Sequence, residues 1–537
     1  MTQAPDIAAA VPPGERIRSR PALAATCALL GFAVVAVAGV LLRPALPIDE
    51  TRYLAVAWEM WLRGDWLVPT KNFALYTHKP PLLFWTINLV WSVAGVSETA
   101  ARLVGPGYAM LALVLTGRLA RGLWPDRPGV GGRAMLALAG TLAFALSGGL
   151  TMFDAALAAA TVGGMLALLR ALERARARDW ALLGLALALG GLAKGPVILI
   201  HLGPALVLAP LWSGRRVTPR GLARGATIAL ATGLGLVALW VVPAAVSGGA
   251  DYRHAILWTQ SAGRVADAFA HARPWWFFVA LLPALLFPWS AAPALWRAAA
   301  RADWREPGLR LCLVWGGAAL VLFSAISSKQ AHYLVPELPA AALAVARLAP
   351  PRFPLRVPAA IVAGLALAGI AAALGLVPLG RAEALIQPPA AAGAACLAAL
   401  AACLAAGRAR GLAGGAVLTL GAILSLNLLI GATAMRPLYD TRPLAAAIVP
   451  FEPRGIAFYG QSYHAEFNFA GRLAAPVATP ATARELDAWQ AAHPEGVIVA
   501  RLDKDHPFWP PGRTIPFRNA PYALWRVADA PRPEPLP

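Results

Sequence analysis

The stretch "PALAATCALLGFAVVAVAGVLL", residues 21–42, decides the fold class because it is apolar from end to end. A helix of about 20 residues crosses the roughly 30 Å hydrocarbon core of a bilayer, and this run is long enough to do so. Similar runs recur along most of the chain and are continuous rather than alternating in polarity. The pattern predicts an all-α, polytopic membrane protein rather than a set of β-barrel strands.

Composition supports the same class. The 537 residues are 58% hydrophobic and 14% charged, with a mean hydropathy of +0.60, which no ordinary soluble domain of this length could bury. The net charge of +20 comes from arginines in short loops between apolar runs rather than from one continuous basic face. We therefore expect membrane lipids, and no nucleic acid, as partners.

Thirteen spans are expected, and the loops between them follow the positive-inside rule. The expected spans are residues 22–42, 103–122, 133–150, 152–171, 180–194, 196–212, 222–246, 276–296, 307–327, 332–349, 357–378, 390–407 and 412–432. With this count the arginine-rich loops share one side with the N-terminus, and that side is predicted to be cytoplasmic. The C-terminus is then expected on the opposite, exoplasmic side.

Three parts follow from this topology. Residues 1–20 form a cytoplasmic tail, and residues 21–435 form the membrane domain, which includes a first exoplasmic loop at 43–101. Residues 436–537 contain short β-like runs such as "GIAFYG" and "GVIVA", which predict a small α/β domain outside the cytoplasm.

The first exoplasmic loop is predicted to carry two helices that lie along the membrane surface. Residues 50–63 place Leu54, Trp58 and Trp61 on one face, and Gly64 can end the helix. The segment from Pro81 to Ala94 is apolar but too short to span, and counting it as a span would invert every later loop.

The stretch "LPIDETRYLA", residues 46–55, places two adjacent carboxylates at the start of this loop. Asp49 could simply cap the helix that follows, but one acid would suffice for that. Arg52 and Tyr53 complete a polar cluster near hydrocarbon, where ionised groups are costly and usually functional. Adjacent helical residues point about 100° apart, so Asp49 and Glu50 are not expected to face the same substrate atom.

Further polar residues are predicted on the same exoplasmic face. Lys79 precedes two prolines in "YTHKPPLLFW", where it could anchor the chain by snorkelling or hold a phosphate at the membrane surface. Asp154, which could also cap a helix, and Lys194 lie at the ends of spans. His332 and Tyr333 follow in "SSKQAHYLVP". Lysines on this side oppose the positive-inside rule, which suggests an anionic ligand.

The motifs "IDETRY", "YTHKPPLLFW", "TMFDAAL", "GLAKGP" and "SSKQAHYLVP" resemble those of membrane glycosyltransferases of the 4-amino-4-deoxy-L-arabinose transferase and protein mannosyltransferase type, over about residues 20–350. The resemblance implies a GT-C fold in the bacterial inner membrane. It further implies transfer, with inversion, of a sugar from a polyprenyl (undecaprenyl) phosphate donor to a lipid A, glycan or protein acceptor on the periplasmic face.

The resemblance also implies roles for individual residues. The catalytic acid falls on Asp49, with Glu50 as its neighbour. The residues implied to bind the donor phosphate are Lys79, Arg264 and Lys194, and those implied to line the cavity are Arg52, Tyr53, Asp154, His332 and Tyr333. A carboxylate can accept the proton of an attacking hydroxyl, while fixed cations stabilise a leaving phosphate.

The sequence departs from this family in two places. His78 stands where the aminoarabinose transferases have an acid, and a loop histidine is replaced near Gln260. These departures weaken any metal site carried over from the family and leave the identity of the sugar open. His78 with His271 could still bind a divalent metal such as zinc, although solitary histidines are more often hydrogen-bonded loop residues.

A transporter or flippase of lipid-linked sugars is the main alternative, and a structural membrane scaffold is a third. Internal repeats would favour a transporter, and the sequence shows none that we recognise. The polar residues instead concentrate in one asymmetric first loop, which favours an enzyme.

Overall fold

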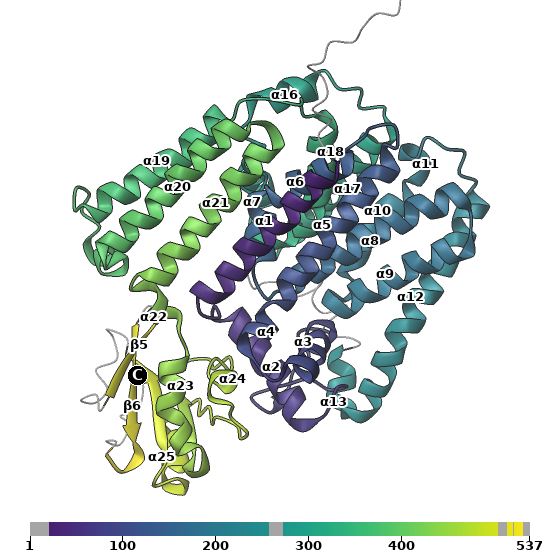
Figure 1. Cartoon of the computed structure of the whole chain (residues 1–537). Helices are drawn as coiled ribbons and strands as arrows, with labels where there is room; N and C mark the ends of the chain where they lie inside the picture. Colours follow the sequence, from purple (N-terminus) through teal and green to yellow (C-terminus); the bar gives the residue numbers. More distant parts are fainter. Residues whose placement is uncertain (1–20, 257–271, 503–512, 519, 530–537) are drawn as a thin grey trace, which may run out of the picture.

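A computed structural model describes residues 21–256, 272–502, 513–518 and 520–529. Long helices form a bundle, and a smaller unit with strands lies at one end of it, beside the short helices of the first loop (Figure 1). The chain is a multi-pass membrane protein with a small strand-containing C-terminal domain, as predicted.

In the described chain, nine helices are long and apolar enough to cross a membrane. A tenth is added if the bent pair α6 (Val130–Ala139) and α7 (Leu142–Gly148), which meet at 73°, counts as one span. The long spans comprise α1 (Pro21–Leu42), α4 with α5 (Glu98–Arg102 and Val104–Leu123), α8 (Phe153–Arg174), α9 with η2 and α10 (Ala177–Lys194, Gly195–Val197 and Ile198–Val207), α12 (Pro219–Ser247), α17 (Pro307–Ala325), α19 (Arg356–Ala373), α20 (Pro389–Ala409) and α21 (Gly411–Ala432).

The predicted spans 276–296 and 332–349 are broken rather than continuous. The first contains α15 (Phe277–Leu285), followed by turns before α16 (Pro293–Ala300), and the second joins the 3-10 helix η4 (Ala331–Glu337) to α18 (Leu338–Leu348). Pro288 and Pro336 lie in these segments, and proline removes a backbone donor and disfavours a regular α-helix around it. Trp289 stabilises the first break by donating a hydrogen bond to the Ala137 carbonyl at 2.9 Å.

Contacts at the two ends of α8 show that α9 and the segment after it run in opposite directions. Lys194 pairs with Asp154 at the start of α8 at 2.6 Å, whereas Arg215 pairs with Glu173 at its end at 3.5 Å. The chain between them, which includes α10 and α11 (Ala209–Trp212), therefore returns along the length of α8.

The arginine-rich loops gather at the α8 end marked by Glu173. There Arg310 donates to the Leu211 carbonyl at 3.0 Å, and Arg347 pairs with Glu306 at 2.8 Å. The polar residues of the first loop lie at the other end. The two sets of loops distinguished in the sequence thus occupy opposite ends of the bundle.

The first loop contains α2 (Asp49–Arg63), the short hairpin strands β1 (Thr70–Lys71) and β2 (Ala74–Leu75), and α3 (Leu82–Ala94). Gly64 ends α2 in a left-handed conformation, with φ 65°, as predicted. The N-cap position is Ile48, which has no side-chain cap, so the alternative of a capping role for Asp49 is wrong. The short α3 exposes Leu89 and Val93, as suits an apolar helix at a membrane surface.

The C-terminal unit holds a four-stranded sheet in the order β3–β4–β6–β5. Strand β3 (Ile456–Tyr459) runs parallel to β4 (Val497–Arg501), and β6 (Ala520–Arg526) is antiparallel to β4 and β5 (Arg513–Phe517). The other short helices are α13 (Gly249–His254), η5 (Gly380–Ile386), α22 (Met435–Tyr439), α23 (Arg442–Ile448), η6 (Val449–Arg454), α24 (Asn468–Gly471), α25 (Ala483–Ala492) and η7 (Val527–Asp529).

This unit packs directly on the first loop. The indole of Trp58 donates to the Leu473 carbonyl at 2.9 Å, and the rings of Trp91 and Phe469 stack with centroids 5.4 Å apart. The C-terminal unit therefore borders the same end of the bundle as Asp49.

Candidate active site

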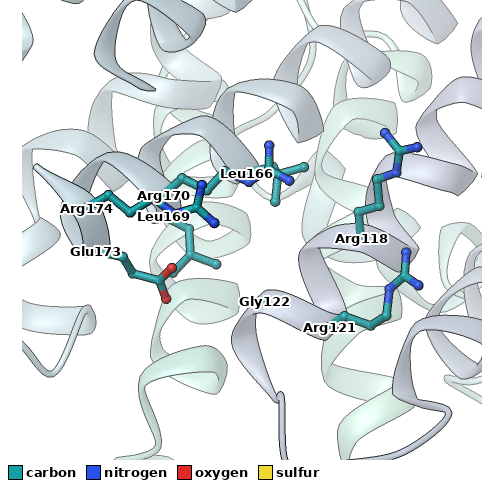
Figure 2. A pocket seen from close by; sticks show the side chains of 8 residues that line it. All are labelled: Arg118, Arg121, Gly122, Leu166, Leu169, Arg170, Glu173 and Arg174. Carbon is teal, nitrogen blue, oxygen red and sulfur yellow. The ribbon is translucent and has the colours of Figure 1, made fainter. Parts of the chain in front are cut away.

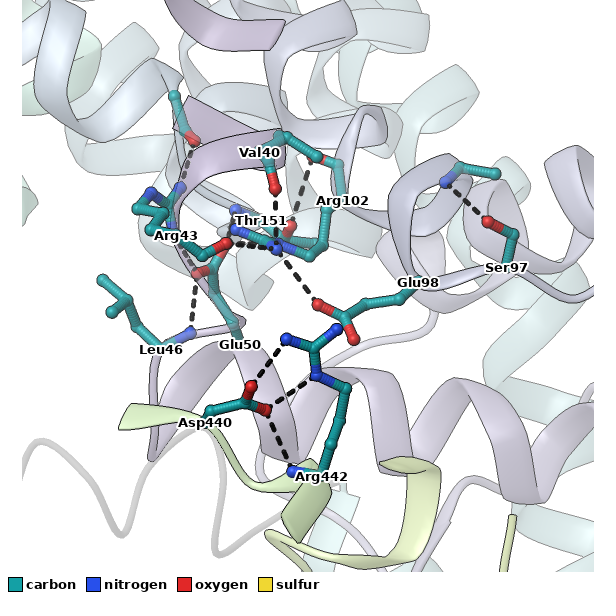
Figure 3. Close-up of polar contacts among 12 residues, drawn as sticks. Val40, Arg43, Leu46, Glu50, Ser97, Glu98, Arg102, Thr151, Asp440 and Arg442 are labelled. Carbon is teal, nitrogen blue, oxygen red and sulfur yellow. Dashed lines mark hydrogen bonds and ion pairs between the residues drawn. The ribbon is translucent and has the colours of Figure 1, made fainter. Parts of the chain in front are cut away.

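The two adjacent acids of the first loop have different surroundings. Glu50 is buried and pairs with Arg43 at 2.6 Å, while its other oxygen accepts a hydrogen bond from the Thr151 backbone at 2.9 Å (Figure 3). The Leu46 backbone donates to it as well, and Arg102 lies 4.0 Å away. Both carboxylate oxygens are thus occupied by protein groups.

These contacts keep Glu50 ionised. Burial alone would raise the pKa of this carboxyl, but Arg43 and Arg102 outweigh that effect and lower the pKa below its ordinary value. Glu50 joins the start of α2 to the end of α1, to α4 and to the turn before α8. This geometry gives Glu50 a structural role and offers no support for the predicted catalytic one.

Asp49 points away from this buried network and is about half exposed. Its carboxylate accepts hydrogen bonds from Arg52 and from the Tyr53 hydroxyl, the latter at 3.1 Å. Burial raises the pKa of Tyr53 well above its ordinary value, and nearby Asp49 adds to this, so the phenol stays a hydrogen-bond donor. Asp49 is therefore an oriented carboxylate with room for another partner.

An aromatic cluster connects Asp49 to the other predicted residues. The ring of Tyr53 meets that of Phe153 edge to face at 4.9 Å, and Phe84 contacts Phe153 at 5.4 Å. The Lys79 ammonium lies 5.7 Å from the centre of the Phe153 ring. The cluster fixes Lys79 and the start of α8 beside α2.

The start of α8 supplies Asp154, which is buried against Lys194 at 2.6 Å. The Lys194 ammonium also lies 4.9 Å from the centre of the Tyr333 ring, and Tyr333 meets His332 edge to face. His332 interacts electrostatically with Asp154, Lys194, Lys79 and Asp49. Residues from four separate segments of the sequence therefore meet at one end of the bundle.

Comparison with solved structures identifies this architecture. A crystal structure of ArnT from Cupriavidus metallidurans bound to undecaprenyl phosphate matches with a TM-score of 0.72 at 20% identity, over 96% of this chain and 99% of that one. The apo form of the same ArnT matches with a TM-score of 0.67 at 22% identity, over 89% and 93% of the two chains. The chain has the GT-C fold.

Sequence comparisons agree with the resemblance drawn from the motifs. Residues 78–242 match the model of the dolichyl-phosphate-mannose-protein mannosyltransferase family. The undecaprenyl phosphate-alpha-4-amino-4-deoxy-L-arabinose arabinosyl transferases of Pseudomonas aeruginosa PAO1 and of Pseudomonas paraeruginosa PA7 are 34% and 33% identical. Each alignment covers 54% of this chain and 53% of the relative, so the match spans about half the length of these GT-C relatives.

Some predicted residues cannot be placed in this GT-C site. Arg264 and His271, with Gln260, lie outside the described residues. His78 stacks on Tyr76 with ring centroids 5.5 Å apart. Within the described ranges, no group of three or more His, Cys, Asp or Glu side chains could hold a metal ion. The role of His78 and His271 as metal ligands therefore stays a prediction.

The sequence did not predict the residues that the C-terminal unit brings to the site. His464 interacts electrostatically with Lys71, Arg52 and Asp49, and Lys71 interacts with Glu466. Burial and the cations beside it lower the pKa of His464. No local signal could have placed these residues near Asp49, because more than 400 residues of chain separate them.

Glu59 shows how the C-terminal unit is held there. Its carboxylate accepts hydrogen bonds from the backbones of Asn72 and Phe73, at 2.6 and 2.8 Å, and from the Asn468 side chain at 3.2 Å. Burial raises the pKa of Glu59 above its ordinary value despite these donors. An acid in the helix of the first loop thus connects that loop to the C-terminal unit.

Proposed function

We propose that this chain is an inverting glycosyltransferase that moves a sugar from a polyprenyl phosphate carrier to a lipid A, glycan or protein acceptor. The observation that carries the proposal is the meeting of an oriented, accessible Asp49 with Lys79 and the Asp154–Lys194 pair at one membrane end of a GT-C bundle. The Pseudomonas relatives, named for an undecaprenyl phosphate-linked aminoarabinose donor, support this class of donor.

In the proposed reaction, the acceptor oxygen attacks the anomeric carbon from the face opposite the carrier phosphate. Asp49 accepts the proton of the acceptor hydroxyl as the new C–O bond forms. The bond between the anomeric carbon and the phosphate oxygen breaks, and its electron pair leaves with the lipid phosphate. Inversion follows from attack and departure on opposite faces.

The cations serve the leaving group. Lys79 is placed to meet the phosphate as its charge grows, and fixed positive groups at a developing charge usually supply the largest catalytic term. Lys194 is already paired with buried Asp154, so we assign it two roles, in binding the phosphate and in shaping the site beside Tyr333. Arg264 remains a proposed further phosphate contact.

We further propose an orientation. The arginine-rich end faces the cytoplasm according to the positive-inside rule. The Asp49 end and the C-terminal unit then lie outside the cytoplasm, on the periplasmic face of a bacterial inner membrane. The polyprenyl donor would reach the site from the lipid, and the acceptor would approach Asp49 from its exposed side.

The test compares membrane glycolipids and glycoproteins by mass spectrometry in cells that carry the intact chain, Asp49→Asn or the control Asp251→Asn. Asp251 is an exposed acid on α13, at the same end of the bundle. We expect the mass of one transferred sugar to disappear from one acceptor class in Asp49→Asn only. Unchanged glycosylation at normal protein levels would overturn the assignment and favour the transporter alternative, whose activity does not need a general base.

A further inference from the structure

A cavity of about 350 Å³ opens between α5 and α8 at the end of the bundle opposite to Asp49. Arg118 and Arg121 border it from α5, and Arg170 and Arg174 border it from α8 (Figure 2). Arg170 follows Asp154 by 16 residues on α8, which separates the two by about 24 Å along the helix axis.

The lining of the cavity also includes three uncharged residues. Leu166 and Leu169 of α8 line it together with Gly122 of α5. A Cβ atom at Gly122 would lie 2.9 Å from the Leu169 side chain, so the two helices approach closely here because the glycine has no side chain. The lining thus combines four arginines with two leucines that are largely buried.

The charge of the rim is not balanced by the protein. Of the described lining residues only Glu173 is acidic, and it pairs with Arg215 at 3.5 Å. Among the described parts of the chain, no acid pairs with the four rim arginines, and none of their side chains makes a hydrogen bond there.

Some other arginines at the same end of the bundle have partners, whereas Arg352 and Arg356, in the described part of the chain, do not pair with an acid. Arg133 donates to the Ala346 carbonyl at 3.0 Å, and Arg347 pairs with Glu306. The positive-inside rule accounts for arginines at this end, and what distinguishes these four is that they line one cavity between two helices. Like charges held this close repel one another, and a bound anion would remove that cost.

We propose that this cavity binds the phosphate of an anionic phospholipid head group. Guanidinium groups match phosphate oxygens with two parallel hydrogen bonds, and basic pockets between the ends of membrane helices suit lipid head groups. The acyl chains would extend from the cavity into the surrounding lipid. This site is separate from the proposed donor site and does not depend on the transferase activity.

The test measures lipid binding to the purified full-length chain in neutral detergent by native mass spectrometry. The probes are phosphatidylglycerol, phosphatidylcholine and inorganic phosphate. The variant is Arg118→Gln with Arg174→Gln, and the control is Arg352→Gln with Arg356→Gln, which removes the same charge from exposed positions at the same end. We expect the variant to bind phosphatidylglycerol at least about tenfold more weakly, with the control unchanged.

Three outcomes would overturn the proposal. They are equal binding of phosphatidylglycerol by variant and intact chain, equal binding of phosphatidylcholine and phosphatidylglycerol, and binding of inorganic phosphate without binding of the lipid. The variant Arg118→Lys with Arg174→Lys keeps the charge at both positions and serves as a second variant in case the glutamine variant misfolds. It should bind phosphatidylglycerol with intermediate affinity, because lysine lacks the guanidinium fork.

Discussion

Asp49 and Glu50 are neighbours in the chain but belong to two different regions of the molecule. Glu50 lies in a buried network with Arg43 and Arg102, where every contact is with the protein itself. Asp49 lies in a half-exposed cluster with Arg52 and Tyr53, beside the lysines. The comparison teaches that two adjacent acids can have different roles. Protein partners keep Glu50 ionised and occupied, whereas Asp49 stays accessible to a ligand.

The largest expected effect follows from a substitution of Asp49, the accessible acid. Asp49→Asn keeps the shape and the contact with Tyr53 but removes the general base, so we expect sugar transfer to fall by about 10²–10⁴-fold. Thermal unfolding of the purified chain should change little, because the carboxylate is half exposed. Turnover with purified membranes and a polyprenyl phosphate sugar measures the first quantity. Activity above a tenth of the original would remove Asp49 from the proposed mechanism.

The second prediction concerns a substitution of Glu50, the buried acid. Glu50→Gln leaves the buried charge of Arg43 without a carboxylate and leaves Arg102 with Glu98 alone, which should lower the free energy of unfolding by about 3–5 kcal/mol. Equilibrium unfolding in mixed micelles gives the value.

Glu98→Gln is the matched control for that measurement. Glu98 also pairs with Arg102, at 3.0 Å, but its side chain is partly exposed, so we expect a loss below about 1 kcal/mol. Equal losses in Glu50→Gln and Glu98→Gln would contradict the distinction between the two regions.

How far the sequence could predict this arrangement depends on the kind of contact. The short helix at Pro81–Ala94 followed from its length, and the expectation that Asp49 and Glu50 point in different directions followed from the helical period; both are local properties. The choice of Asp49 as the catalytic acid came from the family resemblance. The burial of Glu50 by Arg102 and the contact of Glu59 with Asn468 depend on tertiary packing. Neither could be predicted from one sequence without knowing which segments meet.

The buried pair of His201 and Glu337 is another contact that the sequence did not indicate. The two residues lie on α10 and η4, in two different predicted spans, and are 136 positions apart in the sequence. Span prediction places both in the membrane but does not say which faces pack together, so it could not pair them. Buried polar groups of this kind become visible only with the packing of the bundle.

A third prediction separates the two lysines of the site. Lys79→Gln should weaken the use of the polyprenyl donor by about 10–100-fold, the range of one or more charged hydrogen bonds, and leave the unfolding temperature nearly unchanged. Lys194→Gln should also lower that temperature, because it leaves buried Asp154 without its partner. Donor dependence of the initial rate and thermal unfolding distinguish them. A Lys79 variant with normal donor use would argue against a phosphate at this position.

The smallest expected effect concerns the pH dependence of the contact between the first loop and the C-terminal unit. Burial raises the pKa of Glu59 in the folded chain above its unfolded value, so the folded state binds the proton more tightly. The stabilisation that comes from protonated Glu59 is fully present below the pKa of Glu59 in the unfolded chain. It is lost as the pH rises through the pKa of Glu59 in the folded chain. Hydrogen exchange of the C-terminal unit should therefore slow as the pH falls from 7 toward 5, after correction for intrinsic exchange.

Glu59→Gln should flatten this dependence, because the amide does not titrate, whereas Glu495→Gln, at an exposed position, should leave it intact. Glu466 contributes in the same direction, since burial also raises its pKa, so a small slope should remain in Glu59→Gln. A slope of the opposite sign would mean that the backbone donors of Asn72 and Phe73 outweigh burial at Glu59. In that case the loop would hold Glu59 as an ionised acid, as Arg43 and Arg102 hold Glu50, and the two buried acids of α2 would belong to one class.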